Sequence, residues 1–305
     1  MPARAKVGHS ARMEAVAEGE VDVDEQRPPG DPERAGPSRL LPRRSAAPLA
    51  ALAGPGCRAV YAVTFGLDGN ALAAADGNGR VYLWNTASGA LAATFAPPRS
   101  RGVIGAAFDP DGEFLAAADG NGRAHLWDMM TGELTRTFVP RRSGGLNGVA
   151  FGLGGDLLAA AGDGQVYLWD VVSGQIAGTY TIPGRTTVYA VTFTPGGDVL
   201  AAACGNGWVY LWDVASRGLA GAFAGPGSRG VNGVAFGPSG ELLAGADGNG
   251  QVFVWEVAGS RLVGAFGGPG SRGVNGVAFG PSGDLLAAGD GNGSVYLWRM
   301  SSPAT

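Results

Sequence analysis

From residue 49 onward, short apolar runs separated by turn residues recur along the chain with a period of about 43 residues. In one unit the apolar runs span residues 231–236, 242–246, 252–255 and 262–266, and Gly, Pro, Ser and Asp are frequent in the segments between them. Runs this short, bounded by turn residues, are typical of β-strands. Each unit is therefore predicted to be an antiparallel meander of four strands.

The third run of each unit is apolar on both faces. Side chains alternate along a strand, so Val252 and Val254 point to one side of this predicted strand and Phe253 and Trp255 to the other. A sheet with two apolar faces must be covered on both. We therefore expect each unit to lie between two neighbours, and one unit alone not to fold.

Aromatic residues mark the repeat. Six tryptophans are separated by 43, 42, 43, 43 and 43 residues: Trp84, Trp127, Trp169, Trp212, Trp255 and Trp298. Phenylalanines precede them by 19 residues, or by 18 in the third unit: Phe65, Phe108, Phe151, Phe193, Phe236 and Phe279. Repeats of about 40 to 45 residues with four short strands are typical of propeller blades. The predicted fold is all-β: a six-bladed β-propeller of four-stranded antiparallel blades over residues 49–305.

The ends of the repeat array predict how the propeller closes. The last unit ends at Thr305, before its fourth strand could form. Leu52, however, precedes Phe65 by 13 residues, as Phe95 precedes Phe108. The segment 49–53 is therefore predicted to be the outer strand of the last blade, which would cover a raw sheet edge and join the two ends of the domain.

The repeated pattern GxLLAxxDGxGxVYLWD resembles WD40 repeats over about residues 49–298, with Asp128, Asp170 and Asp213 as the aspartate after tryptophan. Most members of that family have seven blades, whereas six are counted here. No unit has the family's glycine-histidine pair. The family's aspartate six residues before tryptophan is kept only as Asp163; the other units have asparagine there: Asn78, Asn121, Asn206, Asn249 and Asn292. The resemblance implies a scaffold or adaptor that binds proteins or peptides, often within a larger complex.

The N-terminal 48 residues differ from the repeats. They contain seven prolines, no aromatic residue and 16 charged residues, eight of each sign. Such a segment buries too little apolar surface to offset the entropy of ordering, so we expect a disordered tail that is a linker or, alternatively, a short docking segment. Arg43 and Arg44 precede an apolar stretch, but that stretch is short and far from the N-terminus, so an export signal is disfavoured and a cytoplasmic location is expected.

Composition argues against several classes of function. Twenty-two basic and 26 acidic residues give a net charge of −4, which offers no electrostatic footprint for nucleic acid or a membrane surface. Two histidines and two cysteines are too few for a metal site built from those ligands, and no catalytic motif occurs. We therefore expect no cofactor, no metal and no catalytic residue. Cys57 and Cys204 lie in opposite units and should be free thiols, and His125, which replaces a core tyrosine or phenylalanine, should be a core residue.

Arginine and aspartate recur together at one end of the predicted blades, which we call the top. In four units an arginine stands seven residues before the phenylalanine and an aspartate eight residues before the tryptophan; the third and fourth units lack both. This co-occurrence suggests an ion pair between top loops, within or between blades, and shared descent of similar units is the alternative explanation. The predicted pairs are Arg58 with Asp76, Arg101 with Asp119, Arg229 with Asp247, and Arg272 with Asp290.

The third and fourth units leave a distinctive set of top residues. Arg141, Arg142 and Arg185 lack that aspartate partner, and Trp208 occupies a position that is Arg, Gln or Ser in the other units. An aromatic residue beside arginines is typical of an interface hot spot. These four residues are the candidate site, and an acidic or phosphorylated protein segment is the candidate ligand.

The sequence favours a non-catalytic scaffold, with a propeller that is monomeric within a complex. One alternative is an enzyme or small-molecule binder that uses the channel mouth. The small residues expected along the axis argue against it: Gly105, Gly148, Gly233 and Gly276. A second alternative is a regulatory or sensory domain of a signalling system, which the sequence leaves open.

Overall fold

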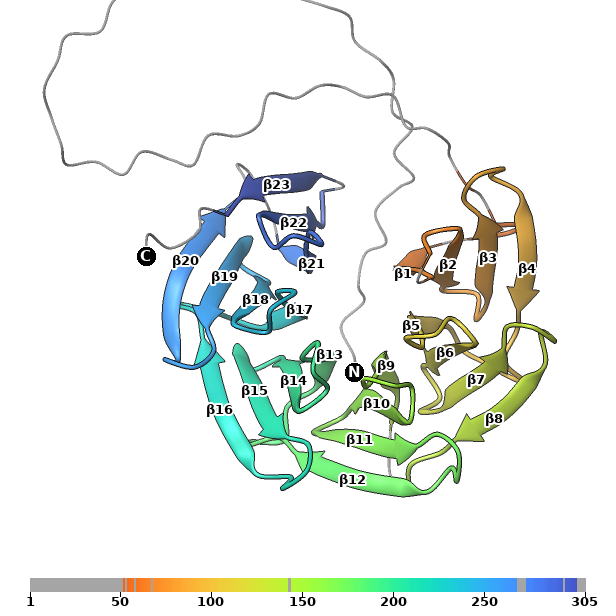
Figure 1. Ribbon diagram of the computed structural model, residues 1–305, viewed down its shortest axis with the longest axis horizontal. Coiled ribbons are helices and arrows are strands. Elements are labelled where there is room, and N and C mark those ends of the chain that lie inside the picture. The colour runs from red at the N-terminus through yellow and green to blue at the C-terminus, as the bar shows by residue number, and fades with distance from the viewer. Residues whose placement is uncertain are drawn as a thin grey trace, which may run out of the picture. The chain divides into compact units, whose positions relative to one another are not determined.

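The computed structural model describes residues 52, 54–57, 59–66, 68–141, 144–267, 273–292 and 294–300. Within these residues the chain forms 23 β-strands in six antiparallel sheets and no helix. The sheets follow one another around a common axis, as Figure 1 shows. The prediction of a six-bladed β-propeller is confirmed.

The strands of the first three blades are β1 (Val60–Phe65), β2 (Ala71–Asp76), β3 (Val81–Asn85), β4 (Leu91–Phe95), β5 (Val103–Phe108), β6 (Phe114–Asp119), β7 (Ala124–Asp128), β8 (Leu134–Phe138), β9 (Leu146–Phe151), β10 (Leu157–Gly162), β11 (Gln165–Asp170) and β12 (Ile176–Thr181). Those of the last three are β13 (Val188–Phe193), β14 (Val199–Cys204), β15 (Trp208–Asp213), β16 (Leu219–Ala224), β17 (Val231–Phe236), β18 (Leu242–Asp247), β19 (Gln251–Glu256), β20 (Arg261–Gly267), β21 (Val274–Phe279), β22 (Leu285–Asp290) and β23 (Val295–Arg299).

The core lies between the sheets, because both faces of the second and third strands are apolar. In β19 the four residues from Val252 to Trp255 are all buried, as expected for a sheet covered on two sides. The fourth-strand aromatic of one blade contacts the tryptophan of the next blade, with ring centroids 5.5 Å apart for Phe95 and Trp127. Four further pairs repeat this contact at 5.4 to 5.9 Å: Phe138 with Trp169, Tyr180 with Trp212, Phe223 with Trp255, and Phe266 with Trp298. The spacing of the aromatic residues along the sequence thus records packing between blades.

The first strands of the blades lie next to the axis and pack against one another. A methyl group on Gly105 in β5 would lie 2.8 Å from the Cα atom of Gly148 and 2.9 Å from the carbonyl oxygen of Asn147, both in β9. These neighbours are backbone atoms of β9, which is hydrogen-bonded to β10 in its own sheet, so they cannot rotate away as a side chain could. Glycine at this position therefore lets adjacent inner strands approach closely.

Substituting Gly105 by alanine is expected to lower the free energy of unfolding by about 1 to 3 kcal/mol, because the added methyl overfills a packed interface. The matched control is Gly289→Ala. No atom lies within 4 Å of a methyl group built on Gly289. Urea unfolding of both variants would check this, and equal stability of the two would contradict the packing described for β5 and β9.

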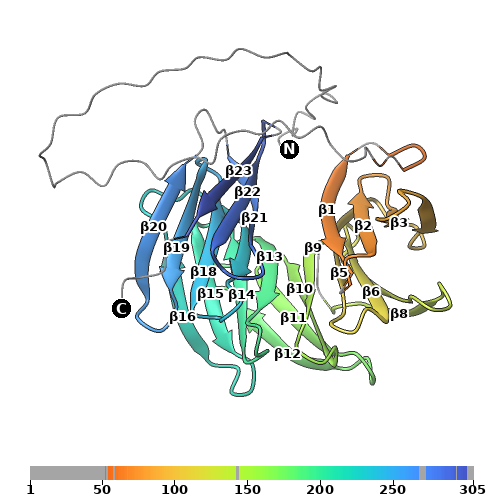
Figure 2. The same cartoon turned by 45° about the horizontal axis from the view of Figure 1, so that its top comes forward.

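The two ends of the blade series differ from the interior. The sixth sheet contains three strands among the described residues. Within the same residues, this sheet does not pack against β1 in the way that neighbouring blades pack against each other (Figures 1 and 2). Val63 and Phe65 in β1 are each 62% exposed, whereas Val191 and Phe193, at the same positions of β13, are each 8% exposed. The first blade thus presents an apolar face of the kind that other blades bury.

The predicted closing strand, residues 49–53, lies outside the described residues except for Leu52. The Leu52 side chain packs against the cluster of Ala74, Tyr82 and Trp84 in the first blade. This is the place that Phe95 takes against Trp127 one blade further on. The position of Leu52 agrees with the predicted register, and closure by this strand stays a prediction. The tail, residues 1–48, also lies outside the described part of the chain.

Candidate functional site

Two kinds of loop build the top face: the hairpins between the second and third strands, and the loops that enter the first strands. Within one blade they are hydrogen-bonded to each other. The N–H groups of Gly120 and Gly248 donate to the carbonyls of Gly102 and Gly230 at 3.0 and 2.8 Å. Each entering loop also reaches the preceding blade: a methyl group on Gly164 would lie 3.3 Å from Arg185. The top face is therefore one connected surface of backbone-tied loops.

The repeated aspartates of the hairpins turn inward. Asp76, Asp119 and Asp247 have no exposed surface, and Asp290 is 8% exposed. The Oδ1 atom of Asp76 accepts hydrogen bonds from the backbone N–H groups of Asn78 and Arg80 at 3.0 and 2.9 Å. The same two bonds recur in the second and sixth blades, and the first of them in the fifth. These carboxylates hold the hairpin backbone in shape, because they satisfy donors that would otherwise be buried without partners.

The structure does not bring the predicted arginine partners to these carboxylates. Arg101 and Arg229 are exposed, and in the described part of the chain neither lies within 4.0 Å of Asp119 or Asp247. The physical reason is that hydrogen bonds from the backbone N–H groups of the turn already stabilise the charge of the carboxylates, and bringing a guanidinium inside would require its desolvation. Arg58 and Arg272 lie outside the described residues, so their pairs with Asp76 and Asp290 stay predictions.

The asparagines of the hairpins tie the two kinds of top loop together. The side-chain amide of Asn121 donates to the backbone carbonyl of Arg99 at 2.6 Å, across 22 residues of sequence. Asn78 and Asn249 donate in the same way to the carbonyls of Gly56 and Gly227. A neutral amide can act as this donor, whereas an ionised carboxylate can only accept. The replacement of aspartate by asparagine in the repeat therefore has a structural role of its own.

The environment of the second carboxylate oxygen differs from blade to blade. Oδ2 of Asp119 lies 3.2 Å from Nε2 of His125, Oδ2 of Asp290 accepts from the Tyr296 hydroxyl at 3.2 Å, and the Ser228 hydroxyl donates to Asp247. In the first blade, Cys57 replaces that serine, and among the described residues Oδ2 of Asp76 has no hydrogen-bond partner. A thiol is a weaker donor than a hydroxyl, which explains the unsatisfied oxygen.

His125 is a core residue, as predicted. It is 1% exposed, and its ring centroid lies 5.8 Å from that of Trp127. Its Nδ1 atom lies 3.2 Å from the hydroxyl of Thr137, so both ring nitrogens have partners. Burial by itself raises the pKa of Asp119, but hydrogen bonds from His125 and from the backbone of Arg123 and Asn121 outweigh it, and the pKa lies below its usual value. Sequence reasoning missed this pair, although a histidine six residues after the repeated aspartate was a visible signal.

The candidate residues of the third and fourth blades lie on the top face. Arg141 and Arg185 are exposed, and neither has a carboxylate within 4.0 Å in the described part of the chain. Arg185 has a φ of 50°, a left-handed backbone conformation that is uncommon outside glycine. Its loop is held on both sides, since the N–H of Gly164 donates to the carbonyl of Thr186 and that of Gly205 to Thr187. Arg142 lies outside the described residues.

Trp208 begins β15 and is 41% exposed. Its ring stacks on Tyr210, with centroids 6.2 Å apart and planes 20° from parallel. The hydroxyl of Tyr210 accepts a hydrogen bond from the amide of Asn206 at 3.1 Å, and Asn206 in turn accepts from the backbone N–H of Trp208 at 3.2 Å. The indole is thus held in one orientation with part of its surface open to a partner, which lowers the entropy that binding must offset.

The thiols are not positioned for chemistry. Both cysteines are free, as predicted. Burial raises the pKa of Cys204 to about 12, and burial together with Asp76 raises the pKa of Cys57. A thiol with a raised pKa is a poor nucleophile at neutral pH.

Two further kinds of site, metal centres and membrane-spanning helices, are absent from the described residues. No group of three or more His, Cys, Asp or Glu side chains is placed to hold a metal ion there. Nor does that part of the chain contain a helix long and apolar enough to cross a membrane.

Six successive antiparallel sheets, five of four strands and one of three among the described residues, define a β-propeller made of sequence repeats. The family model described as WD domain, G-beta repeat matches the chain six times, at residues 47–85, 89–128, 132–170, 177–213, 219–256 and 260–299. These matches cover most of the chain, which therefore belongs to the WD40 family. Propellers of this family are commonly protein-interaction scaffolds and generally not enzymes. No curated protein matches the chain.

Proposed function

We propose that this protein is a cytoplasmic, non-catalytic scaffold whose top face binds an acidic or phosphorylated segment of a partner protein. The observation that carries the proposal is the exposed, pre-oriented Trp208 on the same face as Arg141 and Arg185. Arginine and tryptophan are the residues most enriched in interface hot spots, because both offer a large contact area together with directed hydrogen-bond donors.

The charge of the whole top face supports an acidic ligand. Because the repeated aspartates are buried, their charge is directed at the hairpin backbone and not at solvent. Among the described hairpins of the top face, one carboxylate is exposed, that of Asp163. The exposed arginines outnumber it: Arg80, Arg99, Arg101, Arg141, Arg185 and Arg229.

Guanidinium groups suit both carboxylate and phosphate ligands, since their donors form a planar fork. One exposed ion pair contributes only about 0 to 1 kcal/mol. Several on one surface act together, and they add long-range attraction that speeds association at low salt. The apolar anchor at Trp208 would then supply the part of the binding energy that salt does not screen.

Replacing Trp208 and Arg185 together by alanine is expected to weaken binding of an acidic peptide by about tenfold or more, since a buried aromatic anchor is typically worth 2 kcal/mol. The probe is a short peptide in which glutamates flank a leucine, with a phosphoserine version beside it, and the measurement is isothermal titration. Arg261→Ala, on the opposite face, is the matched control and should leave the affinity unchanged. Unchanged binding by the double variant would contradict the assignment of the site to Trp208 and Arg185. Failure of the wild-type protein to bind either peptide would contradict the proposal that the ligand is acidic.

A further inference from the structure

The end of the propeller opposite the top face has a repeated chemistry of its own. We define the bottom face by the loops between the first and second strands and those between the third and fourth strands. In five blades the first kind of loop carries an exposed carboxylate at one position: Glu113, Asp156, Asp198, Glu241 and Asp284. In the first blade this position is Asn70. The bottom face is therefore acidic at regular intervals.

These loops form a connected rim. A methyl group on Gly155 would lie 3.4 Å from Asp109 of the preceding blade, and one on Gly283 would lie 3.2 Å from Pro238. Each loop is also tied to the other bottom loop of its blade, as when the N–H of Met300 donates to the carbonyl of Asp284 at 2.8 Å. The carboxylates are thus carried by a braced surface and keep a fixed spacing.

Few of the carboxylates on this face are neutralised. Two ion pairs occur there among the described residues: Arg261 with Glu256 at 3.2 Å and Arg299 with Asp284 at 3.8 Å. The exposed carboxylates are more numerous: Asp68, Asp111, Glu113, Glu133, Asp156, Asp198, Glu241 and Asp284. Exposed carboxylates therefore outnumber the exposed arginines of the bottom face, Arg217, Arg261 and Arg299, whereas arginines predominate on the top face.

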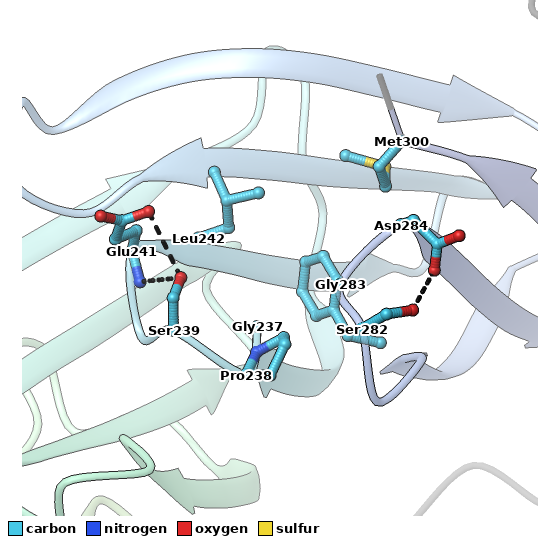
Figure 3. A pocket seen from close by; sticks show the side chains of 10 residues that line it. Gly237, Pro238, Ser239, Glu241, Leu242, Ser282, Gly283, Asp284 and Met300 are labelled. Atoms are coloured by element: carbon cyan, nitrogen blue, oxygen red, sulfur yellow. Dashed lines mark hydrogen bonds between the residues drawn. The ribbon is translucent and has the colours of Figure 1, made fainter. Parts of the chain in front are cut away.

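A cleft interrupts the bottom face between the fifth and sixth blades. It has a volume of about 200 Å³, and Figure 3 shows Glu241 at one end and Asp284 at the other. Leu242, Phe279 and Met300 supply its apolar lining. Among the described residues Glu241 accepts only a long side-chain hydrogen bond, from the Ser239 hydroxyl at 3.4 Å, and so keeps most of its acceptor capacity. Asp284 accepts from the Ser282 hydroxyl and forms a long, exposed ion pair with Arg299 at 3.8 Å, which a bound cation would have to share or displace.

We propose that this cleft binds a cationic segment of a partner protein, in which an apolar side chain lies between arginine or lysine residues. The apolar side chain would fill the cleft over Phe279 and Met300, and the flanking cations would reach Glu241 and Asp284. Charge complementarity favours this occupant, and so does a lining that is apolar in the middle and acidic at both ends. A long cationic side chain can cover apolar surface with its aliphatic stem while its charged group stays at the solvent-exposed edge. The proposal is independent of the ligand proposed for the top face.

The test uses a short fluorescein-labelled peptide in which arginines alternate with leucines, titrated with the full chain and followed by fluorescence anisotropy. Wild-type protein is expected to bind at about 50 mM salt and at least tenfold more weakly at about 300 mM, because the ionic contacts are screened. The double variant Glu241→Gln/Asp284→Asn should bind at least tenfold more weakly than wild type. The matched control, Asp111→Asn/Glu133→Gln, removes the same charge from the second blade of the same face and should bind within about twofold of wild type.

Four outcomes would overturn the proposal. They are the absence of binding at low salt, equal weakening by both double variants, equal affinity for a peptide with glutamates in place of the arginines, and low-salt self-association of the wild-type protein that competes with the peptide. The last result would assign the cleft to the arginine-rich top face of a second copy. Trp208→Ala/Arg185→Ala should bind this peptide normally, which separates failure here from failure of the top-face proposal.

Discussion

Removing residues 1–53 is expected to lower the melting temperature by about 10 °C or more relative to a chain that lacks only residues 1–48. The segment 49–53 is predicted to complete the last blade, which has three strands among the described residues. Losing it would remove Leu52 and expose the surface of Tyr82 and Trp84 that Leu52 covers. Burial of one leucine is worth about 1.5 to 3 kcal/mol, and the strand's hydrogen bonds add about 1 kcal/mol each.

For a domain of this size each kcal/mol shifts the melting temperature by about 2 to 4 °C, so the two truncated chains should be easily distinguished by circular dichroism. The single substitution Leu52→Asp in the full chain should move the melting temperature in the same direction by a smaller amount. If both truncated chains melted at one temperature, the segment would not be part of the propeller. The apolar face of β1, where Val63 and Phe65 are each 62% exposed, would then need another cover.

Replacing Asp119 by alanine is expected to lower the free energy of unfolding by about 3 kcal/mol. The change removes the hydrogen-bond acceptor for the backbone N–H groups of Asn121 and Arg123 and for His125. Asp119 has no exposed surface, so water cannot readily replace the lost acceptor. A buried donor left without a partner costs about 1 to 3 kcal/mol. Urea unfolding at neutral pH measures the effect. Asp111→Ala, which alters an exposed bottom loop, is the control and should change stability by less than about 0.5 kcal/mol.

The same carboxylate predicts how stability depends on pH. Its folded-state pKa lies below the reference value of 3.8, through the hydrogen bonds from His125 and the backbone. Because the folded-state pKa is the lower of the two, the stabilisation is fully present above pH 3.8 and is lost as the pH falls through the folded-state value. Wild-type protein should therefore lose stability below about pH 4 more steeply than Asp119→Asn. Parallel curves for the two proteins would show that Asp119 does not contribute to acid unfolding.

Residues whose structure depends on near neighbours were predictable from the sequence. The strands follow from short apolar runs between turn residues, and the positive φ of 89° at Gly250 is the conformation that the DGNG turn requires. The buried second and third strands follow from their two apolar faces. The contact between each tryptophan and an aromatic residue of the preceding blade was present in the sequence as a constant spacing.

The candidate site was predicted in part. Arg141, Arg185 and Trp208 lie on the top face and are exposed, as the meander topology required. The pairing of Arg101 with Asp119 and of Arg229 with Asp247 is not formed, although these residues co-occur in the repeat. Co-occurrence within copies of one unit reflects the shared sequence of the repeat, and residues of its two top loops can point in different directions.

The sequence alone determined the number of blades, the strand order, the two sets of loops and the residues that each set contains, because each depends on alternation and spacing within a repeat. Only the tertiary structure decided that the repeated aspartates face the backbone, that Asn121 bridges two loops, that His125 meets Asp119, and that a cleft opens between the fifth and sixth blades. These depend on side-chain direction and on atoms brought together from distant parts of the chain. A buried polar group takes whichever partner satisfies it at the smallest desolvation cost, and that choice is made only after the loops have folded against each other.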